Sequence, residues 1–205
     1  MRTISGKRLP SLRSFSDVLD AWIKANILCA DEWGDDVPWW YNERASLSLL
    51  AGAVWKVGGI AFEEFSTKKR RKQRKKGLGK LYLGREDLYI KIGNHHFIAE
   101  AKQIWSGATR RNYDPTDRIQ RELEKACAQI KKSPLNGQRR LGILFVVPHI
   151  SRSNQKIVDD CINNWVKKIK EVDCPCCAWA FPSTSRTIKF GHKLYPGVAV
   201  FIRDI

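Results

Sequence analysis

Apolar residues recur at helical spacing in two early segments of the chain, residues 15–33 and 39–57. An acidic turn and Pro38 separate the two segments, and Gly58-Gly59 follows the second, as expected where a helix ends. Polar and basic residues dominate residues 1–10, so we expect a loosely held tail there. The second helix should bury a stripe of apolar side chains at Leu47, Leu50, Ala51 and Val54.

Strand-like runs alternate with helical ones along the rest of the chain. The run LGILFVVP is almost continuously apolar, which is typical of a strand covered on both faces. A helix should begin at Asp114-Pro115 and bury one stripe, at Ile119, Leu123, Ala126 and Ile130. The remaining expected elements are a short strand at 60–65, a hairpin at 84–103, a helix at roughly 154–170 and late strands at 177–181 and 197–202.

This order of elements predicts an α/β fold, with a mixed β-sheet flanked by helices on both faces. We see no internal repeat or interdomain linker, and 205 residues suffice for a single compact domain with a good core. Within it, residues 1–38 are expected to form an N-terminal tail and helix, and residues 39–205 the main domain.

The charge of the chain indicates its kind of partner. Lys and Arg total 37 against 21 Asp and Glu, a formal net charge of +16. Such an excess favours a polyanion, most often nucleic acid, with an anionic membrane surface as the weaker alternative. We find no apolar run of transmembrane length and no signal peptide, so we expect a cytoplasmic protein without a membrane partner. Six cysteines fit a reducing compartment better than a disulfide framework.

The hairpin carries two acids within arms that are otherwise apolar. With Gly93-Asn94 as a two-residue turn, Ile92 pairs with His95. Continuing that count along both strands places Asp87 directly opposite Glu100. Opposed like charges destabilise a sheet unless something compensates them, and a divalent cation bound between the carboxylates would do so.

Lys102 adds a third charge on the same side, because side chains alternate along a strand and Lys102 lies two residues beyond Glu100. An exposed, salt-bridged sheet face would explain the three charges without any function. The apolar neighbours of the acids, however, indicate a covered hairpin. A longer turn that included His95 would shift the register by one residue and break the alignment.

These residues resemble the motif of the PD-(D/E)XK superfamily, the restriction-endonuclease-like nucleases. That family has an Asp on the second strand of a meander and (D/E)xK on the third, matched here by Asp87 and by Glu100-Ala101-Lys102. Gln103 follows the Lys, as it often does in the family. The chain departs from the pattern at Glu86, where the family commonly has Pro.

The resemblance spans roughly residues 39–150 and implies a restriction-endonuclease-like core in a nuclease domain at 39–205. It implies a metal-dependent DNA endonuclease, such as those of microbial restriction, anti-phage defence or mobile-element processing. The implied cofactor is Mg²⁺, with Mn²⁺ as a substitute, held by three carboxylates: Asp87, Glu100 and Glu43. The implied catalytic set is Glu43, Asp87, Glu100, Lys102 and Gln103.

Glu43 is the least secure member, since an acid in the first turn of a helix is also favoured by the helix dipole. Glu63 and Glu64 are the substitutes if Glu43 has only that role. Lys102 would orient or deprotonate the attacking water, and we leave these two roles open because its pKa is under competing influences.

The basic run at residues 68–76 supplies eight positive charges and is expected to form a loop near the hairpin. Such a run binds phosphates without sequence preference, although a solvated charge run or a nuclear localisation signal has the same composition. The expected nucleic-acid contacts are Lys68, Lys69, Arg70, Arg71, Lys72, Arg74, Lys75, Lys76, Arg85, Arg110 and Arg111.

Other interpretations stay open. Cys174, Cys176 and Cys177 could bind zinc with His192 or His149, but no second Cys pair exists and buried thiols are favoured. The chain could also be a non-catalytic basic module that binds nucleic acid, an RNase, or a nuclease subunit that a partner activates. A homodimer or a larger complex is compatible with each of these functions.

Overall fold

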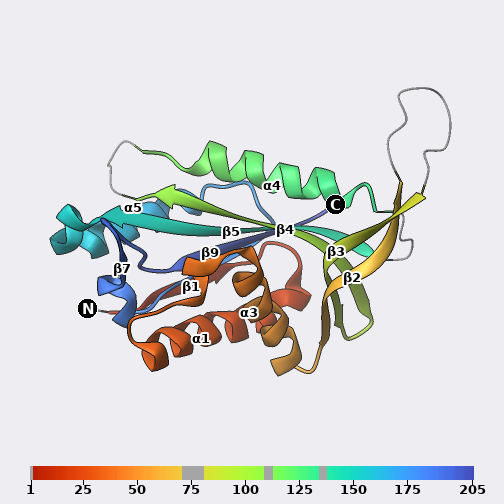
Figure 1. Ribbon diagram of the computed structural model, residues 1–205, viewed down its shortest axis with the longest axis horizontal. Helices are drawn as coiled ribbons and strands as arrows, with labels where there is room; N and C mark the ends of the chain where they lie inside the picture. The colour runs from red at the N-terminus through yellow and green to blue at the C-terminus, as the bar shows by residue number, and fades with distance from the viewer. Residues whose placement is uncertain (1, 71–80, 109–112, 134–137) are drawn as a thin grey trace.

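A mixed β-sheet runs through the molecule, with helices against both of its faces (Figure 1). The computed structural model describes residues 2–70, 81–108, 113–133 and 138–205. The strand order is β1-β6-β9-β5-β4-β3-β2, in which β4 and β5 are parallel and the other neighbours are antiparallel. The strands are β1 (Ile4–Arg8), β2 (Ile60–Arg70), β3 (Leu81–Ile92), β4 (His95–Gly107), β5 (Arg139–Ser151), β6 (Cys176–Phe181) and β9 (Val198–Asp204). The short strands β7 (Lys189–Phe190) and β8 (Lys193–Leu194) pair with each other, and β8 also pairs with the end of β5.

The helices form two layers. One layer holds α1 (Ser16–Trp33), α2 (Pro38–Tyr41) and α3 (Glu43–Lys56), and the other holds α4 (Thr116–Ile130) and α5 (Val158–Ile169) (Figure 1). Short 3₁₀ segments lie at Arg13–Phe15, Arg152–Ile157 and Thr184–Thr187, the second of them kinked at Asn154. The predicted α/β class, with helices on both faces of a mixed sheet, is therefore confirmed.

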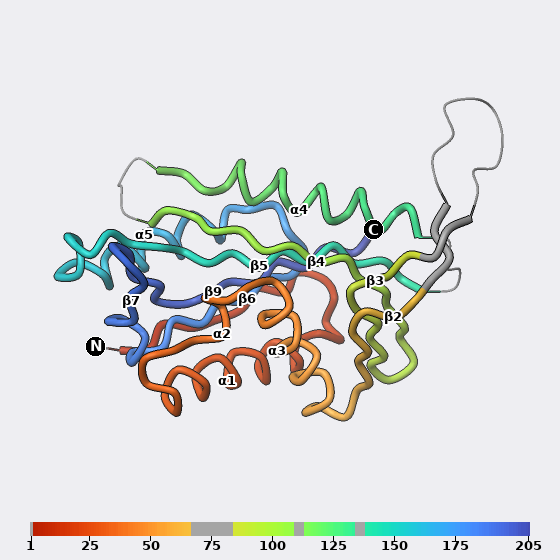
Figure 2. Tube along the Cα trace, viewed as in Figure 1, coloured from red at the N-terminus to blue at the C-terminus, as the bar shows by residue number. Residues whose placement is uncertain are grey.

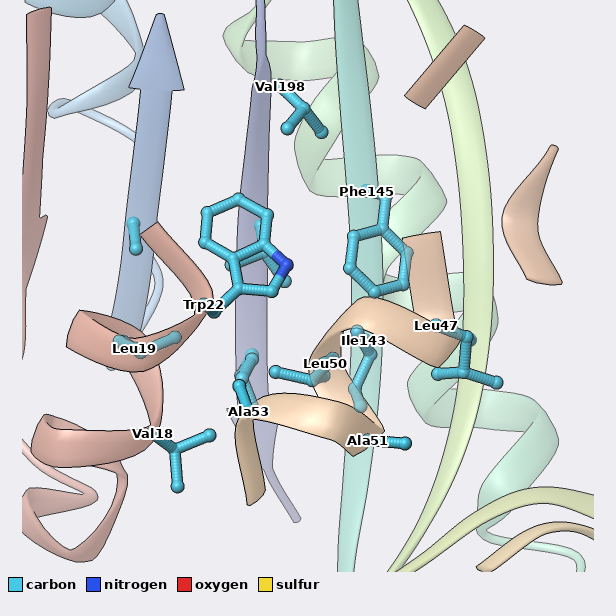
Figure 3. Packing of buried hydrophobic residues seen from close by; sticks show 14 of the residues in the cluster. Val18, Leu19, Trp22, Leu47, Leu50, Ala51, Ala53, Ile143, Phe145 and Val198 are labelled. Atoms are coloured by element: carbon cyan, nitrogen blue, oxygen red, sulfur yellow. The ribbon is translucent and has the colours of Figure 1, made fainter. Parts of the chain in front are cut away.

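Each face of the sheet has its own apolar core. Leu50 of α3 and Trp22 of α1 pack on Ile143 and Phe145 of β5 (Figure 3). The alternate β5 residue Leu144 belongs to the second cluster, with the buried stripes of α4 and α5. The near-continuous apolar sequence of β5 is thus explained by burial on both sides, as predicted.

Two sequence predictions about the first layer are wrong. The expected N-terminal tail is the edge strand β1, which pairs with β6 over its whole length. The single helix expected over residues 39–57 is two helices, because Asn42 is extended and its side chain accepts a hydrogen bond from the Ala45 amide, 3.1 Å away. This cap makes Glu43 the first residue of α3.

The basic run also begins differently from the prediction. Lys68, Lys69 and Arg70 are the last residues of β2 rather than part of a loop. Arg71, Lys72, Arg74, Lys75, Lys76, Arg110 and Arg111 lie outside the described residues.

Candidate active site

The hairpin formed by β3 and β4 has the predicted register. Gly93 takes the positive φ of 56° that a tight turn requires, and Ile92 pairs with His95. The pairing continues to Leu88 and Ala99. Beyond that point the described part of β3 pairs only with β2, whereas β4 stays paired with β5 as far as Gly107. The two strands therefore separate directly before the two predicted acids, and Figure 2 shows them running apart.

Asp87 lies where the strands separate. Its Oδ2 atom accepts a hydrogen bond from the Ala101 backbone amide at 2.8 Å. The side chain thereby satisfies an amide of β4 that has left the β3 ladder. The Asp87 side chain is half-buried rather than enclosed.

The acidic pair and the lysine share one face by the alternation of side chains. Tyr89 lies directly opposite Ile98, so Asp87 belongs to the same face as Glu100 and Lys102. Glu100 is buried at 4% exposure. Lys102 is half-buried, and its Nζ atom donates to Gln129 Oε1 of α4 at 3.2 Å. The predicted shared face is thus present, but Asp87 and Glu100 are not a ladder pair, because the pairing of β3 with β4 ends at Leu88 and Ala99.

Glu43 approaches the same place from the other layer. Partial burial raises the pKa of its carboxyl, and the nearby charge of Asp87 raises it further. The charge of Lys102 and a backbone hydrogen bond from Gln103 lower that pKa, but burial and Asp87 prevail. Asp87 and Lys102 are therefore close enough for their charges to act on the Glu43 carboxyl.

Gln103 lies on the opposite face from Lys102. Its Oε1 atom accepts from Ser46 Oγ at 2.6 Å, and its Nε2 atom donates to the Trp39 carbonyl at 3.2 Å. Both ends of the amide are engaged with α2 and α3, so Gln103 anchors the helix start that carries Glu43. This is a positioning contact, although the sequence motif groups Gln103 with the catalytic residues.

The two substitutes for Glu43 are engaged elsewhere. Glu63 accepts from Ser48 Oγ at 3.0 Å. Glu64 forms ion pairs with Arg44 at 2.6 Å and with Arg85 at 2.9 Å, and its backbone has a positive φ of 49°. Glu43 is therefore the helix-borne acid that the structure brings to Asp87.

Arg44 and Arg85 are a basic pair beside the site. Their side chains are 74% and 67% exposed, so the ion pairs with Glu64 leave most of each guanidinium open to solvent. Arg85 was predicted to contact nucleic acid, whereas Arg44 was missed. The sequence feature that indicates Arg44 is its position directly after Glu43, at the start of a helix.

The carboxylate donors suit a hard cation such as Mg²⁺, which prefers oxygen ligands. The like charges of Glu43 and Asp87, close enough to raise the pKa of Glu43, are a feature that a bound cation would relieve. In the part of the chain that the structure describes, no group of three His, Cys, Asp or Glu side chains is preassembled to hold a metal ion. A metal would therefore have to draw the carboxylates together on binding.

The cysteine cluster has no features of a metal site. Cys174, Cys176 and Cys177 are buried and free, and the Cys174 thiol donates to the carbonyls of Cys176 and Ile202. Burial raises the pKa of Cys174 to about 11, so the thiol stays protonated. The predicted burial of these thiols is confirmed, and Cys176 and Cys177 lie in strand β6.

Comparison of the chain with family models, curated proteins and solved structures finds no match. Among the described residues no helix is both long and apolar enough to cross a membrane.

Proposed function

We propose that the protein is a metal-dependent DNA endonuclease with a restriction-endonuclease-like core. The observation that carries the proposal is the meeting of Glu43, Asp87 and Lys102 where β3 and β4 separate. Two acids and a base from three elements, around a strand edge that opens to solvent, are the groups that phosphodiester hydrolysis needs. The spacing of the motif in the sequence predicts the same residues.

The carboxylates would hold Mg²⁺ through Asp87 and Glu100, with Glu43 as a third ligand or as the group that orients water. When bound, the cation would neutralise charge on the scissile phosphate and lower the pKa of a bound water. The raised pKa of Glu43 makes it a better proton acceptor than an exposed glutamate. Hydrolysis adds the water oxygen to phosphorus and breaks the bond to the 3′ oxygen, which leaves protonated.

Lys102 would stabilise the charge that develops on the phosphoryl oxygens. Its contact with Gln129 holds the ammonium near the site without neutralising it, because the amide oxygen carries no full charge. An ammonium in this position acts on the transition state rather than on substrate binding alone. The loss of Lys102 should therefore lower kcat more than it raises KM.

The charge distribution supports nucleic acid as the substrate. The chain has a net charge of +16, and Arg44 and Arg85 present exposed guanidinium groups beside the site. Guanidinium groups bind phosphate oxygens in a bidentate manner. Arg44 and Arg85 would hold the DNA backbone on one side of the scissile phosphate.

The substrate is tested with purified protein and Mg²⁺ on supercoiled plasmid, linear duplex DNA, single-stranded DNA and RNA. Mg²⁺-dependent cleavage of DNA is the expected result, with cleavage abolished by EDTA. Cleavage of RNA alone would replace DNA as the substrate. Binding to every probe without cleavage of any, in Mg²⁺ or Mn²⁺, would favour the non-catalytic basic module.

A further inference from the structure

A pocket of about 360 Å³ opens next to the candidate active site. Its walls come from α2, from the ends of β4 and β5, and from the segment around β8. The lining side chains are Trp40, Tyr41, Trp105, His149, Lys193 and Tyr195. A volume of this size lies at the lower end of the range for small-ligand sites, which suits a group the size of one nucleobase.

The inner wall is a fixed aromatic surface. Trp40 stacks face to face on Phe190, with 3.8 Å between ring centroids, and meets Tyr195 edge to face at 4.6 Å. Tyr195 is only 7% exposed. Because these rings hold one another, the wall is ordered before any ligand arrives.

The outer wall presents aromatic surface to solvent. Trp105 is 38% exposed and Tyr41 is 53% exposed. Four of the eight tryptophans are buried, whereas Trp105 and Tyr41 place two large exposed rings at one pocket, as a binding surface does. Planar rings of this kind stack on nucleobases.

The polar groups of the pocket complement a nucleotide. Burial and the charges of Lys193 and Arg118 lower the pKa of His149, so its imidazole is neutral near neutral pH. A neutral imidazole offers one hydrogen-bond donor and one acceptor. It therefore complements the edge of a nucleobase, which carries both donors and acceptors. Lys193 is exposed at the rim and supplies a positive charge for a phosphate.

The pocket adjoins the active site along two separate elements. Trp105 follows Lys102 by three residues on β4, about 10 Å along the strand, and by alternation its side chain shares the face of Gln103 rather than that of Lys102. Tyr41 precedes Glu43 by two residues, across the Asn42 cap. The Gln103 contact with the Trp39 carbonyl ties these two elements together.

We propose that this pocket binds one unpaired nucleobase of the substrate, next to the scissile phosphate. A base within a duplex is stacked on its neighbours and cannot enter, so the site would act on single-stranded or locally unpaired strands. The inference rests on the proposed nuclease function and specifies its substrate class. The Trp105 ring supplies the stacking surface that distinguishes a nucleotide from a bare phosphate backbone.

Binding is measured in EDTA, so that no cleavage occurs, by the fluorescence anisotropy of labelled oligonucleotides. The probes are a single-stranded oligothymidylate, an abasic oligomer with the same number of phosphates, and a duplex of equal length. The wild-type protein should prefer the oligothymidylate to the abasic oligomer. Trp105→Ala should weaken oligothymidylate binding by about 5- to 100-fold and leave abasic and duplex binding unchanged.

Trp33→Ala is the matched control, since Trp33 is a 53% exposed tryptophan at the C-terminal end of α1 and is not one of the pocket's lining residues. It should bind all three probes as the wild type does. Trp105→Phe keeps an aromatic face and should restore most of the preference for the base-bearing strand. Circular dichroism melts of each variant identify any loss of folding, and Tyr41→Ala provides a second, independent variant of the pocket.

The outcomes separate the pocket from the nuclease. If the wild type does not distinguish oligothymidylate from the abasic oligomer, or if Trp105→Ala and Trp33→Ala behave alike, the base pocket is refuted even if DNA is cleaved. If Trp105→Ala lowers binding to the abasic oligomer equally, the pocket is a phosphate surface and the proposal is overturned. If base preference depends on Trp105 but no cleavage occurs in Mg²⁺, the pocket stands and the nuclease function falls.

Discussion

The carboxylate of Asp87 on β3 accepts a hydrogen bond from the backbone amide of Ala101 on β4, across 2.8 Å. The contact lies where the two strands separate, and the charge of the same carboxylate acts on Glu43. Asp87 therefore has a structural contact and an electrostatic one. These two contributions can be separated by substitution.

Asp87→Asn keeps an oxygen that can accept from the Ala101 amide, whereas Asp87→Ala leaves that amide without its partner. We expect the Asn variant to stay within about 1 kcal/mol of the wild type in urea unfolding, and the Ala variant to lose about 1–3 kcal/mol. Both should lose cleavage. Equal destabilisation by the two substitutions would show that the charge of Asp87, rather than its hydrogen bond, holds the strands.

Glu43 should make stability fall as pH rises. Its folded pKa lies above the unfolded value because of burial and Asp87, so between those two values the folded state binds more protons than the unfolded state. The penalty is absent below the unfolded pKa and complete above the folded pKa. Glu43→Gln should therefore gain stability over the wild type as pH rises through that window, as measured by urea unfolding at several pH values.

In Asp87→Asn the pKa of Glu43 should fall, which carboxyl-carbon NMR titration detects. An unchanged Glu43 pKa in that variant would contradict the coupling between the two acids.

Mg²⁺ should stabilise the folded protein if the carboxylates bind it. At a concentration one hundred times the Kd, a ligand that binds only the folded state adds about 2.7 kcal/mol. Thermal melts with and without Mg²⁺ should show this gain in the wild type and its loss in Asp87→Asn. Asp173→Asn is the control, because the Asp173 side chain is 99% exposed. A gain that survives in Asp87→Asn would place the cation elsewhere.

Glu64 should restrain DNA binding, because it occupies Arg44 and Arg85. Glu64→Gln should cost no more than about 1 kcal/mol of stability, as exposed ion pairs contribute little. It should tighten DNA binding, whereas Arg85→Ala should weaken it and reduce the slope of log K against log salt by about 1. Filter binding over a salt series measures both effects, with Lys24→Ala on the exposed face of α1 as the control. If Arg85→Ala and Lys24→Ala have the same slope, Arg85 makes no phosphate contact.

The register of the hairpin could be predicted because local chemistry determines it. Gly93 supplies the positive φ that the turn requires, and the two-residue turn Gly93-Asn94 fixes which residues of β3 and β4 are opposed. The double burial of β5 was visible for a similar reason, since an apolar run without alternation needs cover on both faces.

Features that depend on tertiary contacts were not visible in the sequence. The segment Ile4–Arg8 has a single large apolar residue, and it becomes a strand because β6 offers an open edge and Gly6 fits against the ring of Trp179. Asn42 ends one helix and caps the next, which the continuous apolar stripe concealed. The Arg44–Glu64–Arg85 cluster and the aromatic pocket join residues far apart in the chain, so no local pattern indicated them.

The most direct test of the central claim is the rate of DNA cleavage in Mg²⁺ by the wild type and by Asp87→Asn and Lys102→Ala. Each of the two substitutions should remove several kcal/mol of transition-state stabilisation, which lowers the cleavage rate at least about a hundred-fold. Asp173→Asn and Lys125→Ala, on exposed side chains elsewhere, serve as matched controls. The account predicts cleavage by the wild type and both controls and its loss in the two site variants, with DNA binding retained. Cleavage by Asp87→Asn and Lys102→Ala at the wild-type rate would contradict it.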